Sequence, residues 1–114
     1  MDIQIEIQNK LNDLDASVKQ LRTTGTNYAN SYASYRIALA KELVKLKDEG
    51  VAVTLCHDMA RGKPEIARLK FNEIRDEAIY LANRESILAT KLQIKILEEQ
   101  INREYFIAGD DING

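Results

Sequence analysis

The sequence has little of what small secreted domains or metal enzymes depend on. It contains one cysteine, one histidine, one proline and no tryptophan, and its formal net charge is only −2. One cysteine cannot form an internal disulfide, which indicates a reducing compartment. One cysteine and one histidine fall short of the about four ligands of a typical zinc site. We therefore predict no metal and no cofactor.

The near-balanced charge and the lack of a long apolar run exclude two further classes of protein. A net charge of −2 gives no general attraction to nucleic acid, so tight direct DNA binding is not expected. No apolar run approaches the ~20 residues that a membrane span needs. The start, MDIQIEIQNK, lacks the basic and apolar regions of a signal peptide. We expect a cytoplasmic protein without a membrane anchor.

Long helices are what the composition does favour. Hydrophobic residues make up 45% and charged residues 30% of the chain. In the first part of the chain, apolar or small residues recur at alternating steps of four and three: Ile7, Leu11, Leu14, Val18, Leu21, Gly25, Tyr28, Tyr32, Tyr35 and Leu39. This spacing is typical of a helix whose seam faces a partner helix.

The segment 23–27 is the weak point of this first helix. Its sequence, Thr-Thr-Gly-Thr-Asn, is poor in helix formers, and glycine costs roughly 1 kcal/mol relative to alanine. Because the heptad spacing keeps its phase across Gly25, we favour one helix over about 3–48. Two collinear helices, the second capped by Thr26 or Asn27, are the alternative. Gly25 in the seam also permits close approach to the backbone, so a partner or ligand could sit there.

Turn residues divide the remainder of the chain. Gly50 suits the left-handed cap that ends the first helix. Residues 51–53 read as an extended link, and Thr54 is a good N-cap for a short helix over about 55–61. Pro64 at a first helical position opens the last helix, over about 64–106.

Together these elements predict an all-α fold. The expected architecture is a long antiparallel, coiled-coil-like helical hairpin with a short helix at its tip. It would form a single helical domain over residues 1–107, and residues 108–114 would be a frayed tail.

The last helix carries two apolar stripes. One consists of Ala67, Phe71, Ile74, Ala78, Leu81, Leu88 and Leu92; the other of Ile79, Ile87, Ile94, Leu97, Ile101 and Tyr105. A hairpin partner can cover one of them, which we take to be the first. The second then predicts contact with another protomer, and hence a homo-oligomeric bundle.

The tip is the first candidate binding site. Its ligand-binding residues would be Thr54, His57, Arg61, Lys63 and Arg68. Helix N-termini with nearby cations bind phosphate and other anions, so a nucleotide-like ligand is the functional interpretation. A capped turn with solvated charges is the competing one. Cys56 is expected to be a buried thiol, because neighbours on a helix point ~100° apart and cannot form a catalytic dyad.

The tyrosines of the first helix are the second candidate site. Tyr28, Tyr32 and Tyr35, with Arg36 beside them, could stack and hold a nucleobase. At seam spacing the preferred interpretation is that they are core residues with their hydroxyls at the rim. The carboxylates of the last helix, Glu73, Asp76 and Glu77, are predicted to form solvated ion pairs.

Several segments resemble a small family of uncharacterised phage and prophage proteins of Gram-positive hosts. They are GVAVT (50–54), DMARG (58–62), IARLKF (66–71), KLQI (91–94) and LEEQINRE (97–104). The resemblance covers nearly the whole chain and is most specific at the tip. It implies a phage setting, in the host cytoplasm, with the gene among early or recombination genes. It implies no established activity.

The combined expectation is a phage-encoded, non-enzymatic accessory protein that acts by binding. Counter-defence is the first hypothesis: the protein would sequester a host signalling nucleotide or block a host defence protein. A recombination or replication accessory is an alternative, contacting single-stranded DNA or a single-strand-binding or annealing protein. A structural oligomer or scaffold is the other alternative. No catalytic residues are predicted.

Overall fold

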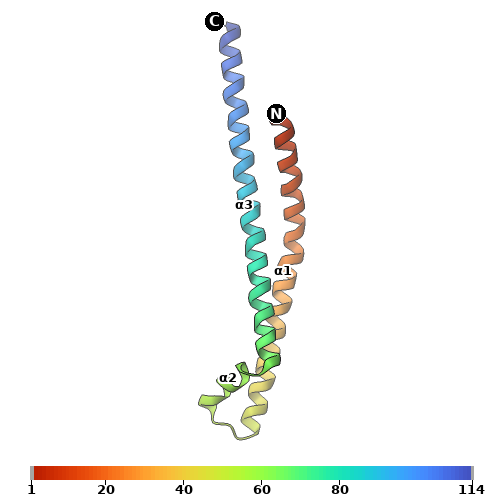
Figure 1. The fold of residues 1–114 in the computed structure, drawn as a ribbon, viewed down its shortest axis with the longest axis vertical. Coiled ribbons are helices and arrows are strands. Elements are labelled where there is room, and N and C mark those ends of the chain that lie inside the picture. Colours follow the sequence, from red (N-terminus) through yellow and green to blue (C-terminus); the bar gives the residue numbers. More distant parts are fainter. Residues whose placement is uncertain (1, 114) are drawn as a thin grey trace. The chain divides into compact units, whose positions relative to one another are not determined.

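The chain folds into three helices. The computed structural model describes the backbone of residues 2–113 and the side chains of residues 2–107. The helices are α1 (Ile3–Asp48), α2 (Val53–Arg61) and α3 (Pro64–Asn113), and the described residues contain no strand (Figure 1). The all-α class of the prediction is confirmed. None of these helices has a stretch both long and apolar enough to cross a membrane, within the described residues.

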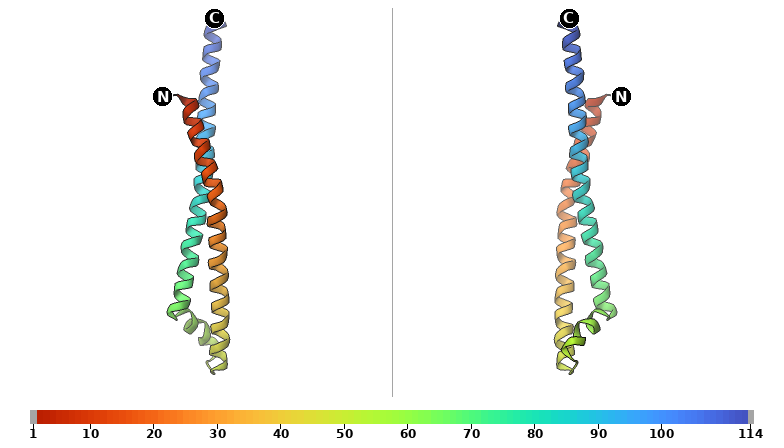
Figure 2. Two further views of the ribbon diagram at one scale, coloured as in Figure 1. Left: turned by 90° about the vertical axis from the view of Figure 1, so that its right-hand side faces the viewer. Right: turned by 90° about the vertical axis from the view of Figure 1, so that its left-hand side faces the viewer.

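Two compact units make up the chain. The tip unit is Arg22–Leu81, which holds the second part of α1, all of α2 and the start of α3. The terminal unit combines the first part of α1, up to Leu21, with α3 from Ala82 onward. Within each unit the α1 segment lies antiparallel beside the α3 segment (Figure 2). This pairing of α1 with α3 confirms the predicted helical hairpin.

Helix α1 runs without interruption through Gly25, as the phase of the heptad spacing predicted. The glycine faces Tyr80 of α3: a Cβ atom at this position would lie 3.4 Å from Tyr80 Cε2. The close approach that glycine permits is therefore used by an aromatic ring of the opposite helix.

The end of α1 is fixed by backbone geometry at Gly50. Its φ angle is +86°, in the left-handed region, as predicted. The Gly50 N–H donates to the carbonyl of Lys47 over 3.1 Å, and the Val51 N–H donates to the carbonyl of Leu46 over 3.0 Å. These bonds satisfy carbonyls that the helix end would otherwise leave unpaired.

Substituting Gly50 by alanine is expected to destabilise the tip unit by about 1 kcal/mol, because an L-residue is strained at positive φ. The space around an added Cβ is open, so no steric clash contributes. Denaturant unfolding of both proteins measures the difference. Gly50→Asn is the matched variant and should lose less, because asparagine tolerates this conformation. Equal stability of Gly50→Ala and the wild type would contradict the cap.

Helix α2 begins earlier than predicted. Its N-cap is Ala52, without a side-chain hydrogen bond, so Thr54 lies inside the helix and does not cap it. The N–H groups of Leu55 and Cys56 both donate to the carbonyl of Ala52. The first turn thus closes through the backbone alone. At the other end of the chain, α3 continues to Asn113, past the predicted end at residue 106. Gly114 of the predicted tail lies outside the described residues.

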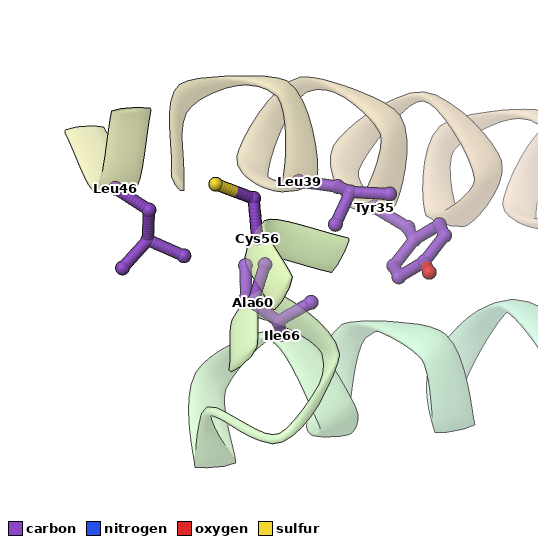
Figure 3. Close-up of a cluster of buried hydrophobic side chains, with 6 residues drawn as sticks. All are labelled: Tyr35, Leu39, Leu46, Cys56, Ala60 and Ile66. Carbon is purple, nitrogen blue, oxygen red and sulfur yellow. The ribbon is translucent and has the colours of Figure 1, made fainter. Parts of the chain in front are cut away.

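A small apolar core holds α2 against the two long helices. It consists of Tyr35, Leu39, Leu46, Cys56, Ala60 and Ile66 (Figure 3). Leu46 is 2% exposed and Ala60 is 0% exposed. The Cys56 thiol lies 3.6 Å from the carbonyl oxygen of Val51. The prediction of a buried thiol is confirmed.

The face that α3 turns toward α1 differs from the predicted one. Its buried and half-buried residues follow a heptad spacing of their own: Ile66, Leu69, Glu73, Asp76, Tyr80, Asn83, Ile87, Thr90, Ile94, Leu97 and Ile101. We call this set the α3 seam. The stripe predicted to face α1 is instead exposed, with Phe71 at 63% and Ile74 at 56%. The assignment of the two stripes was therefore wrong.

The physical reason is that polar side chains occupy the α3 seam and have partners there. Asn83 Nδ2 donates to the carbonyl of Ser17 over 3.1 Å, which joins α3 to α1. The Thr90 hydroxyl donates to the carbonyl of Ser86 over 2.8 Å. A buried polar group costs little once it is hydrogen-bonded, so the α3 seam need not be the most apolar face.

On α1 the predicted stripe straddles the edge of the seam. Tyr28 and Tyr35 turn inward, whereas Leu11, Val18 and Tyr32 are exposed. The heptad spacing therefore identified the side of α1 that faces α3, but several of its residues lie at the edge of the contact rather than in its centre.

Candidate functional site

The tip residues that were predicted to bind an anion differ in their exposure and in whether their charges are paired. The Lys63 ammonium pairs with the carboxylate of Glu42 on α1, which is largely buried. The hydrogen bond to Glu42 raises the pKa of Lys63. The positive charge of Lys63 is therefore offset by a carboxylate of the same chain. Thr54, His57 and Arg68 are exposed.

Arg61 lines an open groove of about 360 Å³, together with Tyr35, Ile66, Ala67 and Lys70. We call it the tip groove. Three elements build it: Tyr35 comes from α1, Arg61 is the last residue of α2, and the other three lie in the first turns of α3. Two of its residues, Tyr35 and Ile66, also belong to the apolar core, which fixes their position.

The two cations of the tip groove are not equivalent. Lys70 Nζ lies 3.1 Å from Glu73 Oε2 and 4.8 Å from the centre of the Tyr35 ring. Its charge is shared with a carboxylate and an aromatic face. The Arg61 guanidinium has no ion pair or side-chain hydrogen bond within the described part of the chain. The tip groove thus offers one free positive charge.

The tyrosine site forms a second groove in the tip unit. It has a volume of about 410 Å³ and is lined by Gly25, Tyr28, Ala29, Tyr32 and Tyr80. The rings of Tyr28 and Tyr80 are 6.0 Å apart between centroids, with an interplanar angle of 33°. Tyr28 is half-buried and packs on α3, whereas Tyr32 is exposed at the rim. Arg36 is exposed as well, outside the lining of this groove.

The charge around the tyrosine groove does not suit a phosphate. Partial burial and the nearby carboxylates of Glu77 and Glu73 raise the pKa of the Tyr28 hydroxyl. A negative environment that disfavours a phenolate disfavours a phosphate in the same way. Stacking of a neutral ring would remain possible here, but a nucleotide would bring its charge toward carboxylates.

Two of the three α3 carboxylates predicted to be solvated, Glu73 and Asp76, lie in the α3 seam instead, which corrects that prediction. Both are buried. Asp76 accepts a hydrogen bond from the Ser31 hydroxyl through Oδ2, and from Arg75 Nε over 3.1 Å through Oδ1. These hydrogen bonds, first from Ser31 and then from Arg75, lower the pKa of Asp76. The heptad spacing of Ile66, Leu69, Glu73 and Asp76 is the signal that could have identified them.

A third groove, in the terminal unit, was not anticipated from the sequence. Its volume is about 560 Å³, and it is lined by Glu6, Asn9, Lys10, Asp13, Gln93, Ile96 and Leu97. The lining combines two carboxylates and a lysine with two apolar side chains. This lining offers no charge of one sign and selects no class of ligand.

The described residues contain no cluster of metal-binding or nucleophilic side chains. No three His, Cys, Asp or Glu side chains there come together as a metal site would require. Cys56 is buried while its neighbour His57 is exposed, so the two do not form a dyad.

An exposed apolar face of α3 is the remaining feature of the tip unit. Phe71, Ile74, Ala78 and Leu81 are all exposed and follow heptad spacing. We call these four residues the outer stripe. On a helix of 3.6 residues per turn, they lie nearly opposite the α3 seam. In the sequence the same spacing continues with Leu88 and Leu92, which are also exposed.

Comparison of the chain with protein-family models, with curated proteins and with solved structures finds no match in any of the three. The resemblance to phage proteins therefore stays a prediction. The function proposed below rests on the geometry of the exposed faces and grooves.

Proposed function

We propose that this chain is a non-enzymatic structural oligomer whose copies pack on one another through the outer stripe. The observation that carries the proposal is the heptad spacing of large apolar side chains on a face of α3 that the hairpin leaves exposed. A helix with apolar heptads on two sides can serve two helical partners. α1 occupies one side, and a second copy occupies the other.

The small core of a single chain favours a second copy as the occupant. Among the described residues, eight hydrophobic ones are buried, and no large side chain is less than 2% exposed. Such an open arrangement buries too little apolar surface for ordinary stability. Covering the outer stripe would supply the missing burial.

The stripe supplies a large part of the area that an interface between two copies needs. Its three large side chains, Phe71, Ile74 and Leu81, each expose on the order of 100 Å², so pairing two copies of the stripe buries roughly 600 Å². Flanking side chains of the same unit would bring the interface toward about 1,000 Å², the size at which specific interfaces begin.

The charges beside the stripe allow like copies to meet. Lys70 and Arg75 flank it, and each is paired within the chain, with Glu73 and Asp76 respectively. Flanking charges decide which coiled-coil partners are accepted. Because these two cations are locally neutralised, two identical stripes can approach with reduced repulsion.

Two isoleucines of α3 provide a matched test. Ile74 (56% exposed) lies on the outer stripe, and Ile79 (49% exposed) lies off it on the same helix. By analytical ultracentrifugation the wild type is expected to be an oligomer. Ile74→Asp should raise the dissociation constant at least about tenfold, because it buries a carboxylate. Ile79→Asp should leave it within about twofold.

Two results would contradict the proposal. One is a wild type that sediments as a monomer throughout the concentration series. The other is dissociation by Ile79→Asp but not by Ile74→Asp. That result would place the interface on the second apolar stripe of α3, which contains Ile79 and was predicted from the sequence to contact another protomer.

Of the three functions considered from the sequence, we favour the structural oligomer because of this exposed stripe. Nucleotide sequestration at the tip would rely on Lys63, which already forms an ion pair with Glu42. The phage setting, the block of a host protein and the recombination role stay predictions, without a structural feature of their own.

A further inference from the structure

The tip groove has the features of a small-molecule site. It adjoins the outer stripe, because Lys70 lines the groove and flanks the stripe. We infer that it binds a small amphipathic monoanion, with one carboxylate held by Arg61 and an apolar body lying on Ile66 and Ala67. The ligand class is an aromatic or aliphatic monocarboxylic acid.

The charge of the groove selects a single carboxylate. Arg61 carries an unpaired guanidinium, whose planar fork matches a carboxylate with two parallel hydrogen bonds. Lys70 adds a second cation, but Glu73 lies 3.1 Å from it and offsets its charge. The groove therefore neutralises about one negative charge. A nucleotide polyphosphate would leave its further charges unpaired.

The walls of the groove suit an apolar body. Ile66 and Ala67 are neighbours at the start of α3, and Tyr35 of α1 lines the groove with them. The volume of about 360 Å³ falls at the lower end of the range for small-molecule sites, ≈ 300–1,000 Å³. This room fits an acid with one or two rings rather than a larger cofactor.

The lining is largely formed in advance. Tyr35 and Ile66 are buried in the core that joins α1, α2 and α3. Lys70 is held between the Glu73 carboxylate and the Tyr35 ring. Arg61 is exposed and follows Ala60, whose complete burial fixes the last turn of α2. A ligand therefore has to order little more than one arginine side chain, which limits the entropic cost of binding.

Titration with 1-naphthoate, followed by amide NMR, tests this inference. The wild type should show saturable shifts at Ile66 and Ala67. Arg61→Gln should weaken binding at least about tenfold, and Arg68→Gln, an exposed arginine of the same region, should change it less than about twofold. 1-Naphthylmethanol has the same rings without the charge, and should bind at least about tenfold more weakly than 1-naphthoate.

Three results would overturn the inference. The first is unchanged binding in Arg61→Gln. The second is saturation at the tyrosine groove or at the outer stripe, with no shifts at the tip groove. The third is ADP binding more tightly than 1-naphthoate, which would make the site a phosphate site. Repeating the titration with Ile74→Asp separates this result from the proposed self-association, since that variant leaves the groove lining intact.

Discussion

Replacing Leu46 by alanine is expected to destabilise the tip unit by about 3 kcal/mol. Leu46 is 2% exposed and packs in the cluster that holds α2 between the long helices (Figure 3). Removing its branched end costs the transfer energy of the lost atoms and leaves a cavity, which together amount to about 2–5 kcal/mol in well-packed sites. This core contains few other buried side chains. A loss of unfolding free energy in the lower half of that range would therefore already lower the midpoint of thermal unfolding by many degrees.

Val44 on the same helix is the matched control. It is 61% exposed, so Val44→Ala should change the free energy of unfolding by no more than about 0.5 kcal/mol. Denaturant unfolding of the two variants and the wild type gives the comparison. Equal losses for Leu46→Ala and Val44→Ala would mean that the cluster around α2 does not form as described.

The same substitution links stability to the tip groove. Arg61 is held in place through α2, and α2 is held by Cys56 and Ala60 in the core with Leu46. Amide hydrogen exchange in α2 should accelerate in Leu46→Ala, because local opening then costs less. 1-Naphthoate binding should weaken together with it, although Leu46 does not line the groove.

The sequence was sufficient for the elements of the fold because their signals are local. Gly50 needs a positive φ, and Pro64 fits a first helical turn. The continuity of α1 through Gly25 followed from the phase of the heptads on either side. Each of these inferences depends on residues a few positions apart, where backbone sterics decide the outcome.

The choice of face on α3 could not be read in the same way. Two heptad sets coexist on that helix, and the more apolar one lies outside. Asn83 and Asp76 were not recognised as seam residues because their partners, Ser17 and Ser31, lie far away in the sequence. A polar residue is stable in a buried position only when it has a hydrogen-bond partner there. These partners are distant in the sequence, so they can be recognised only from the fold.

The candidate sites show the same limitation. Lys63 looked like a free cation beside a helix start, but a half-buried carboxylate from α1, Glu42, is its partner. Arg61 was predicted as a tip cation, and it lines the tip groove. Tyr35 and Lys70, which complete the groove around it, come from separate helices, and no spacing in the sequence brings them together.

Acid is expected to weaken the tip unit through Asp76. The hydrogen bonds from Ser31 and Arg75 hold the pKa of this carboxyl below its ordinary value near 3.8. Folding therefore favours the ionised form. Its stabilising contribution is fully present above the ordinary pKa, declines as the pH falls toward the lowered pKa, and is gone once both the folded and the unfolded chain are protonated.

Asp76→Asn isolates this contribution from the other carboxyl groups. The amide still accepts a hydrogen bond from Ser31 but loses the charge that attracts Arg75. At pH 7 the variant should melt below the wild type, and the gap should narrow as the pH falls below about 3.8. Asp58→Asn, on an exposed face of α2, should show no such gap. A gap between wild type and Asp76→Asn that is the same at pH 7 and pH 2.5 would mean that the ionised carboxylate contributes nothing to this interface, and that the buried polar seam is held by its neutral hydrogen bonds alone.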